Sequence, residues 1–132
     1  MPSNPADRRQ SPRHDAKLQA RLEFSVLLHD TGTAGSGVQH LRAVAGHTLN
    51  LSLHGLAVVL RAQNIEEQYL AGGDGSMSIE LDLPNGLSVA IQATPVRYEK
   101  LDDGYLIGAR ISEMSGRDRE LYEEYLREIA GS

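Results

Sequence analysis

The sequence of 132 residues has no cysteine, no tryptophan and a single phenylalanine. Without cysteine, neither a disulfide framework nor a cysteine-ligated zinc site can hold the fold together, so the chain has to fold by burying apolar side chains. Long apolar runs are missing too: the longest is the five residues Leu56–Leu60, against roughly 20 for a membrane-spanning helix. Because the first 20 residues contain no apolar signal-peptide stretch, we expect a cytoplasmic protein with no membrane insertion.

The net charge of −5 is distributed unevenly along the chain. Residues 1–21 carry five basic and two acidic side chains, a net charge of +3, whereas residues 22–132 carry eight basic and 16 acidic ones, a net charge of −8. An acidic body repels extended DNA or RNA, whose binding depends on many phosphate contacts. A short basic segment can still hold a small anion, so we expect no extended nucleic acid as a partner.

The chain divides into an N-terminal arm and one domain. Residues 1–15 contain three prolines and few apolar side chains, too few to offset the entropy of ordering them. We therefore predict a flexible basic arm over 1–15 and a single domain over 16–131.

Within the domain, six segments have the alternation or the short apolar run that is typical of strands. The alternation also puts Asn50 and Ser52 on one face, opposite Leu49, Leu51 and Leu53. The predicted strands are 17–28, 49–54, 56–60, 77–83, 87–93 and 105–111.

The connections between these strands have recognisable turn signals. Thr31–Gly37 is rich in glycine and small residues and is predicted to be a flexible loop, and Pro84–Gly86 forms a hairpin turn. Residues 61–75 are predicted to be a long polar connection. At Thr94–Pro95 the alternation loses phase, and since proline cannot donate to a ladder, we expect a bulge there.

The C-terminal segment changes to helical periodicity. Ser115 and Asp118 have the spacing of an N-terminal capping pair, and Gly131 is a stop signal. The apolar stripe either covers one end of the sheet structure or pairs with another chain; it consists of Leu121, Tyr122, Tyr125, Leu126 and Ile129. Together these elements predict a mainly β fold, a small six-stranded antiparallel barrel with a C-terminal helix.

No pattern indicates catalysis or a resident metal. The histidines have neither the i, i+4 spacing of a helical zinc pair nor a cysteine partner; they are His14, His29, His40, His47 and His54. The residues of a catalytic triad come together in space, so a triad requires no fixed spacing in the sequence. One recognisable signal, the nucleophile-elbow pattern, is absent from this sequence. We expect no enzyme and no cofactor.

Two short motifs carry the functional hypothesis. Arg9-x-x-x-Arg13 lies in the basic arm, directly after Arg8, and Asn50-x-Ser52-x-x-Gly55 follows the first strand. In this order, on a small antiparallel barrel with a C-terminal helix, they resemble the PilZ domain family, whose hallmarks are R-x-x-x-R and [D/N]-x-S-x-x-G. The resemblance extends from Arg8 to about Ala130.

The resemblance implies a bacterial receptor for the second messenger cyclic di-GMP. A guanidinium can bind phosphate oxygens or guanine O6 and N7, and can stack on the base. Asn50 and Ser52 can bond a guanine edge or a phosphate, while Gly55 lets the backbone approach the ligand without a side-chain clash. The expected ligand-binding residues are Arg8, Arg9, Arg13, Asn50, Ser52 and Gly55.

The resemblance also has implications for stoichiometry and partners. In this family an arginine before R-x-x-x-R, here Arg8, favours a self-intercalated cyclic di-GMP dimer, so two ligands per chain are expected. Arg97 or Arg110 is a further candidate cation for the site. With no second domain in this sequence, the expected partner is a separate effector protein, for which the family offers motility, pilus or polysaccharide machinery.

Two alternatives to the receptor remain open at this stage. The first is a degenerate PilZ-type module that binds a protein and no nucleotide; the intact motif residues count against it. The second is an enzyme on a small barrel, which has no motif in its favour.

Overall fold

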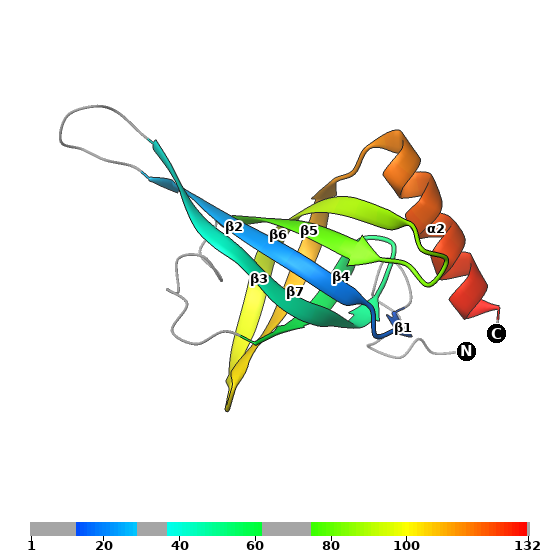
Figure 1. The fold of residues 1–132 in the computed structure, drawn as a ribbon, viewed down its shortest axis with the longest axis horizontal. Coiled ribbons are helices and arrows are strands. Elements are labelled where there is room, and N and C mark those ends of the chain that lie inside the picture. Colours follow the sequence, from blue (N-terminus) through cyan, green and yellow to red (C-terminus); the bar gives the residue numbers. More distant parts are fainter. Residues whose placement is uncertain (1–12, 29–36, 62–74, 132) are drawn as a thin grey trace, which may run out of the picture.

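The chain forms a closed antiparallel barrel with one helix at its end (Figure 1). The computed structural model describes residues 13–28, 37–61 and 75–131. The elements in this part of the chain are β1 (His14–Asp15), β2 (Gln19–Leu28), β3 (Gly37–Leu51), β4 (Gly55–Leu60), β5 (Gly75–Asp82), β6 (Ser88–Leu101), β7 (Gly104–Glu113) and α2 (Gly116–Ala130).

Six strands close the ring in the order β3-β2-β5-β6-β7-β4, and β4 pairs back onto β3. The short β1 is an additional strand on β3, with His14 opposite Leu51 and Asp15 opposite Asn50. Because the ring is closed, each of the six strands has a hydrogen-bonded neighbour on both sides over at least part of its length. An open sheet edge, which could pair with another chain and aggregate, is thereby avoided. The predicted mainly β barrel with a C-terminal helix is confirmed.

Alternation along the strands fills the barrel with apolar side chains. On β2 the inward positions are Ala20, Leu22 and Phe24, and on β5 they are Met77, Ile79 and Leu81. The other strands add the rest of the core, including Leu51, Leu56, Val58, Leu60, Val89, Ile91, Ala93, Tyr105 and Ile107. The alternation of apolar and polar residues along the strands therefore accounts for this core.

Several boundaries differ from the sequence-based expectation. Strand β3 begins at Gly37, well before the predicted start at Leu49, because cross-strand pairing with β2 extends over residues whose own pattern is weak. It also ends at Leu51, and residues 52–54 form a turn into β4. The predicted phase change near Pro95 is confirmed: β6 is continuous, and its register against β7 shifts between Pro95 and Arg97.

Some predictions fall wholly or mainly on residues that the structure does not describe. These are the arm up to residue 12, the glycine-rich loop up to residue 36 and residues 62–74 of the long connection. The division into an arm over 1–15 and a domain over 16–131 stays a prediction; His14 and Asp15, placed in the arm by that division, pair with β3.

Helix α2 begins and ends where the capping signals indicate. The hydroxyl of Ser115 accepts a hydrogen bond from the backbone N–H of Asp118 (3.2 Å), and the N–H of Gly131 donates to the carbonyl of Arg127 (3.0 Å). The apolar stripe packs on the barrel core, with Tyr122 and Leu126 buried. Among the described residues, no helix has the length and apolar character needed to cross a membrane.

Tyr122 anchors the helix to the barrel. Its side chain is almost completely buried, and its hydroxyl donates a hydrogen bond to the backbone carbonyl of Ser52 at 2.7 Å. The contact joins residues 70 positions apart in the chain. It therefore ties the C-terminal helix to the turn between β3 and β4.

Replacing Tyr122 by Phe removes this hydrogen bond and leaves a buried carbonyl without its partner. We expect the free energy of unfolding to fall by about 1–3 kcal/mol, measured by urea denaturation. Tyr125→Phe, one turn along the same helix, is the matched control and should change stability by less. Equal effects of the two substitutions would show that the Ser52 contact contributes nothing of its own.

The burial of Tyr122 also makes the stability of the protein depend on pH in the alkaline range. Burial raises the pKa of the Tyr122 phenol above its ordinary value of 10.0, an effect larger than the opposing one of the Ser52 hydrogen bond. Above about pH 10 the unfolded chain releases this proton while the folded chain retains it, so stability is lost as pH rises. Urea titrations between about pH 9 and 11 should show a shallower loss in Tyr122→Phe; the same slope as wild type would contradict the assignment.

Candidate functional site

The turn between β3 and β4 is built by Ser52 and Gly55. The backbone N–H of Ser52 donates to the carbonyl of Gly55 (2.8 Å), and the Ser52 hydroxyl donates to the same carbonyl (3.0 Å). The Gly55 N–H donates back to the Ser52 hydroxyl at 3.1 Å. Ser52 is buried, so its hydroxyl shapes the turn and does not share the outer face with Asn50, contrary to the alternation-based prediction.

A bulge in β3 directs Asn50 outward. The register against β4 shifts between Thr48 and Asn50, which places Leu49 as the extra residue. Thr48 and Leu51 point into the barrel and are fully buried, whereas Leu49 is 47% exposed. Two consecutive side chains, Leu49 and Asn50, therefore face outward, an arrangement that bulges often produce beside functional sites.

The segment after the arm is held against β3 by Thr48. The Thr48 hydroxyl donates to the carbonyl of Ala16 (2.6 Å) and accepts from the N–H of Leu18 (2.9 Å). Together with the pairing of Asp15 and Asn50 in β1 and β3, these bonds fix the chain just after Arg13. Arg13 donates from Nη1 to the Asn50 side-chain oxygen at 2.9 Å. The last arginine of the first motif and the first residue of the second thus meet directly.

Arg13 and Asn50 line a surface pocket of about 310 Å³. Strands β3, β4, β6 and β7 supply its walls, and its lining combines positive charge, one carboxylate and apolar surface. The lining residues are Arg13, Leu49, Asn50, Ala57, Arg97, Tyr98, Glu99, Leu106 and Gly108. This volume is within the range of small-molecule sites.

Arg97, one of the two further candidate cations, lies in the pocket. A second bulge, at the exposed Val96, sends Val96 and Arg97 to the outer face together. Gly108 faces Arg97 across the ladder, and a Cβ there would come within 3.1 Å of Arg97 Nε. The missing side chain leaves space for the guanidinium to cross β7. Arg110, the other candidate, is not among the pocket-lining residues.

Two cationic side chains, Lys17 and Arg61, lie near His47 on β3. His47 lies on this strand before the bulge, and burial together with the nearby Lys17 and Arg61 lowers its pKa. The lowered pKa favours the neutral imidazole, so the positive charge of this region comes from Lys17 and Arg61, on a chain whose overall charge is negative. Local positive charge of this kind attracts anions.

The structure brings together only some of the predicted site residues. Arg13 and Asn50 meet in the pocket; Ser52 and Gly55 form the turn beneath it; Arg8 and Arg9 lie outside the described residues. The close approach that requires glycine at position 55 is to the protein itself, since a Cβ there would lie 2.9 Å from the carbonyl oxygen of Ala109. A direct ligand contact by Ser52 or Gly55 stays a prediction.

Sequence reasoning missed Leu49 and Glu99 as pocket residues. Leu49 was expected to be buried, because the alternation gave no sign of the bulge. Glu99 follows Arg97 by two positions on the same strand, and this spacing is the signal that would have placed both on one face, once Arg97 was taken as a site residue.

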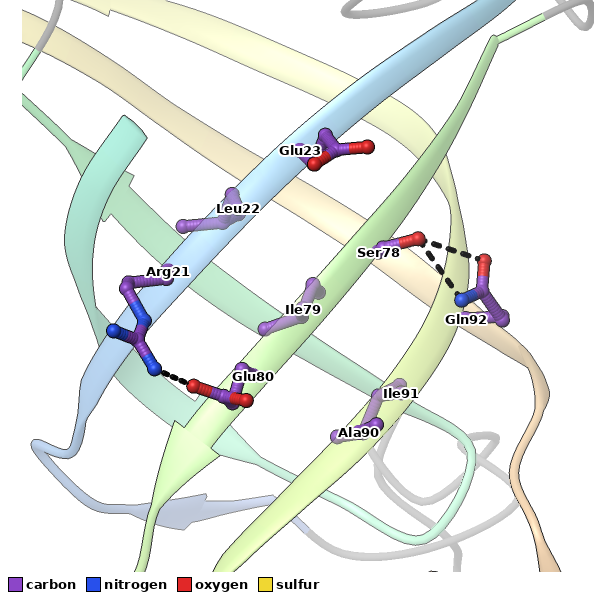
Figure 2. Close-up of a pocket in the computed structure, with 9 residues that line it drawn as sticks. All are labelled: Arg21, Leu22, Glu23, Ser78, Ile79, Glu80, Ala90, Ile91 and Gln92. Atoms are coloured by element: carbon purple, nitrogen blue, oxygen red, sulfur yellow. Dashed lines mark hydrogen bonds and ion pairs between the residues drawn. The ribbon is translucent and has the colours of Figure 1, made fainter. Parts of the chain in front are cut away.

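Another surface hollow, of about 450 Å³, lies on the outer face of β2, β5 and β6 (Figure 2). Several of its polar side chains bind one another: Arg21 forms an ion pair with Glu80 across the two strands, and the uncharged Ser78 and Gln92 are hydrogen-bonded to each other. None of the sequence motifs contributes to it. The motif-bearing pocket is the candidate site.

Comparisons with known proteins agree with this assignment. Residues 7–128 match the PilZ domain family, while a search of curated proteins gives no match. Among solved structures, the chain is similar to the Bacillus subtilis inhibitor of motility MotI (DgrA), with a TM-score of 0.63 and 20% identity over 95% of this chain. It spans 52% of the MotI chain, about half its length.

The PilZ domain of Escherichia coli YcgR, solved with cyclic di-GMP, is a second similar structure. Its TM-score is 0.61, with 11% identity over 93% of this chain and 92% of that one. At these identities the two structures establish the fold alone. Members of the matched family are receptors and adaptors, which confirms the expectation that this domain is not an enzyme.

The role assigned to Gly55 can be tested by stability. Gly55→Ala pushes a Cβ against the carbonyl of Ala109, so we expect a loss of about 1–3 kcal/mol in the free energy of unfolding. Gly116→Ala is the matched control, since no atom lies within 4 Å of a Cβ there and alanine favours a helix. Stability is measured by urea denaturation. If Gly55→Ala is as stable as the wild-type protein, β4 and β7 can move apart at this point at little cost, and the role assigned to Gly55 is wrong.

Proposed function

The chain belongs to the PilZ domain family, and on that premise we propose that it is a receptor for cyclic di-GMP that acts as an adaptor. In this proposal the ligand binds at the Arg13–Asn50 pocket and orders the N-terminal arm across the outer face of the barrel. The ordered arm and the ligand then present a surface to a separate effector protein.

The observation that carries the proposal is the hydrogen bond between Arg13 and Asn50. These residues belong to two motifs that are 37 positions apart, and the fold brings them to one pocket. Both side chains are of a type that suits phosphate and guanine, because a guanidinium carries five N–H groups and an asparagine amide nitrogen carries two. Arg97 adds a second guanidinium in the same pocket.

The chemistry of the pocket fits the parts of a cyclic dinucleotide. The two guanidinium groups can bind phosphate oxygens in bidentate geometry or the O6 and N7 atoms of guanine. Leu49, exposed by its bulge, supplies an apolar surface against which a base can pack. Arg8 and Arg9, five and four positions before Arg13, are proposed to complete the cation set.

The proposed stoichiometry is two ligands per chain. Two stacked cyclic di-GMP molecules carry four phosphates and four guanines, and three arginines of the arm together with Arg97 offer enough guanidinium groups to engage several of them. Arg8 is the residue on which this dimer depends most directly.

The partner is proposed to be a motility, pilus or polysaccharide protein. MotI is an inhibitor of motility, which makes a motility component the first partner to test. The switch is an order transition of the arm, driven by charge-assisted hydrogen bonds to the ligand phosphates.

The test is a calorimetric titration with cyclic di-GMP at low and raised salt. We expect saturable binding of about two ligands per chain, weakened by salt because charge attraction is screened. Arg13→Ala and Asn50→Ala should each weaken binding by at least about tenfold, since a charge-assisted hydrogen bond contributes about 1.5–3 kcal/mol.

The matched control is Arg21→Ala, which removes an exposed arginine from the β2–β5–β6 face and should leave binding unchanged. Arg8→Ala should lower the stoichiometry to about one. If the folded wild-type protein gives neither heat nor a shift of its melting temperature, the receptor proposal fails, and the degenerate protein-interaction module takes its place.

A further inference from the structure

The pocket contains one acidic side chain, Glu99, and its presence at an anion-binding site requires an explanation. It follows Arg97 by two positions on β6, so both side chains lie on the outer face of the strand. A carboxylate beside bound phosphates weakens their binding. A site that bound only phosphate would bind it more tightly without this carboxylate.

Glu99 is not neutralised by its neighbours in the part of the chain that the structure describes. No ion pair there involves Glu99 or Arg97. The adjacent cation, Lys100, is directed to the ring of Tyr105, with Nζ 4.5 Å from the ring centre. Glu99 therefore faces the pocket with its acceptor oxygens available to a ligand.

We propose that Glu99 is a specificity-determining residue that selects guanine over adenine in the bound cyclic dinucleotide. This inference rests on the receptor function proposed above. A carboxylate only accepts hydrogen bonds, and guanine presents two adjacent donors, N1–H and the N2 amino group, which together match its two oxygens. Adenine presents an unprotonated N1 and lacks the N2 amino group.

The discrimination combines attraction and repulsion. With guanine, two charge-assisted hydrogen bonds offset the free-energy cost of desolvating the Glu99 carboxylate. With adenine, the N1 lone pair faces a carboxylate oxygen, and the two repel each other. A binding site that has to reject a close analogue commonly contains such a repulsive element. Asn50 cannot supply it, because its side-chain oxygen accepts from Arg13 and its amide nitrogen can donate to an acceptor atom of either base.

The other residues of the pocket support this division of roles. In this division Arg13 and Arg97 are assigned to the phosphates, which every nucleotide carries, and the apolar Leu49, Ala57 and Leu106 are assigned to the faces of the bases, which do not distinguish one base from another. Among the described lining residues, Glu99 alone is restricted to accepting hydrogen bonds at its side chain.

The experiment compares cyclic di-GMP with cyclic di-AMP and the mixed cyclic GMP–AMP by calorimetry, on wild-type protein, Glu99→Gln and Glu99→Ala. Wild type should prefer cyclic di-GMP over cyclic di-AMP by about 10- to 100-fold, in line with one bidentate base contact. Glu99→Gln should lose about tenfold in affinity for cyclic di-GMP and none for cyclic di-AMP. Glu113→Gln, which removes an exposed carboxylate away from the pocket, is the matched control and should keep the wild-type ratio.

Three results would overturn the inference, and they are distinguishable from failure of the receptor function. An unchanged guanine preference in both Glu99 variants, with folding verified by melting temperature, shows that Glu99 does not read the base. An equal gain in affinity for all three nucleotides shows that it acts by charge repulsion alone. Both leave the receptor proposal intact, whereas no binding of cyclic di-GMP by wild type removes both proposals.

Discussion

The hydrogen-bonded turn at residues 52–55 is the constraint on which the rest of the molecule depends. Ser52 uses its backbone N–H and its hydroxyl to close the turn on Gly55, and its carbonyl receives the hydroxyl of Tyr122. Gly55 allows β4 to approach β7 closely. One short turn thus starts β4, closes the barrel and anchors α2, and it sets Asn50 at the end of the preceding strand. The second motif is therefore a folding element in its own right.

Two bulges place the pocket on this frame. At Leu49 and at Val96 an extra residue turns an apolar and a polar side chain outward together, which brings Asn50 and Arg97 onto the same face. A regular strand would have placed one residue of each pair in the core. The pocket exists because the two ladders are irregular at these two points.

Much of this fold follows from the sequence. The alternation at residues 17–28, the hairpin at Pro84–Gly86 and the caps of α2 all rest on local patterns, and the structure has them. The length of β3 was missed because cross-strand pairing, not its own pattern, makes residues 37–48 a strand. The position of Leu49 was missed because the alternation of Leu49, Leu51 and Leu53 runs unbroken across the bulge, which has no proline to mark it as Pro95 marks the other one.

The candidate site was also predictable only in part, because local sequence patterns indicate some of its residues and the tertiary fold determines the others. Arg13 and Asn50 were found through motifs, since their residue types and order are characteristic. Ser52 was expected beside Asn50, but the strand ends at Leu51, and the hydroxyl turns to the backbone of Gly55. Glu99 had no motif to mark it. Its significance depends on β6 lying across the pocket from Arg13, which only the closed barrel establishes.

The contact between Tyr122 and Ser52 also has a consequence for the order of folding. Strand β4 completes the ring only when β7 has been synthesised, and the turn at Ser52 gains its last hydrogen bond only from α2. Pairings between distant parts of a chain form slowly because loop-closure entropy opposes them. A chain emerging from the ribosome can therefore assemble its pocket only near the end of synthesis, and a truncated copy that lacks β7 has neither a closed barrel nor a complete pocket wall.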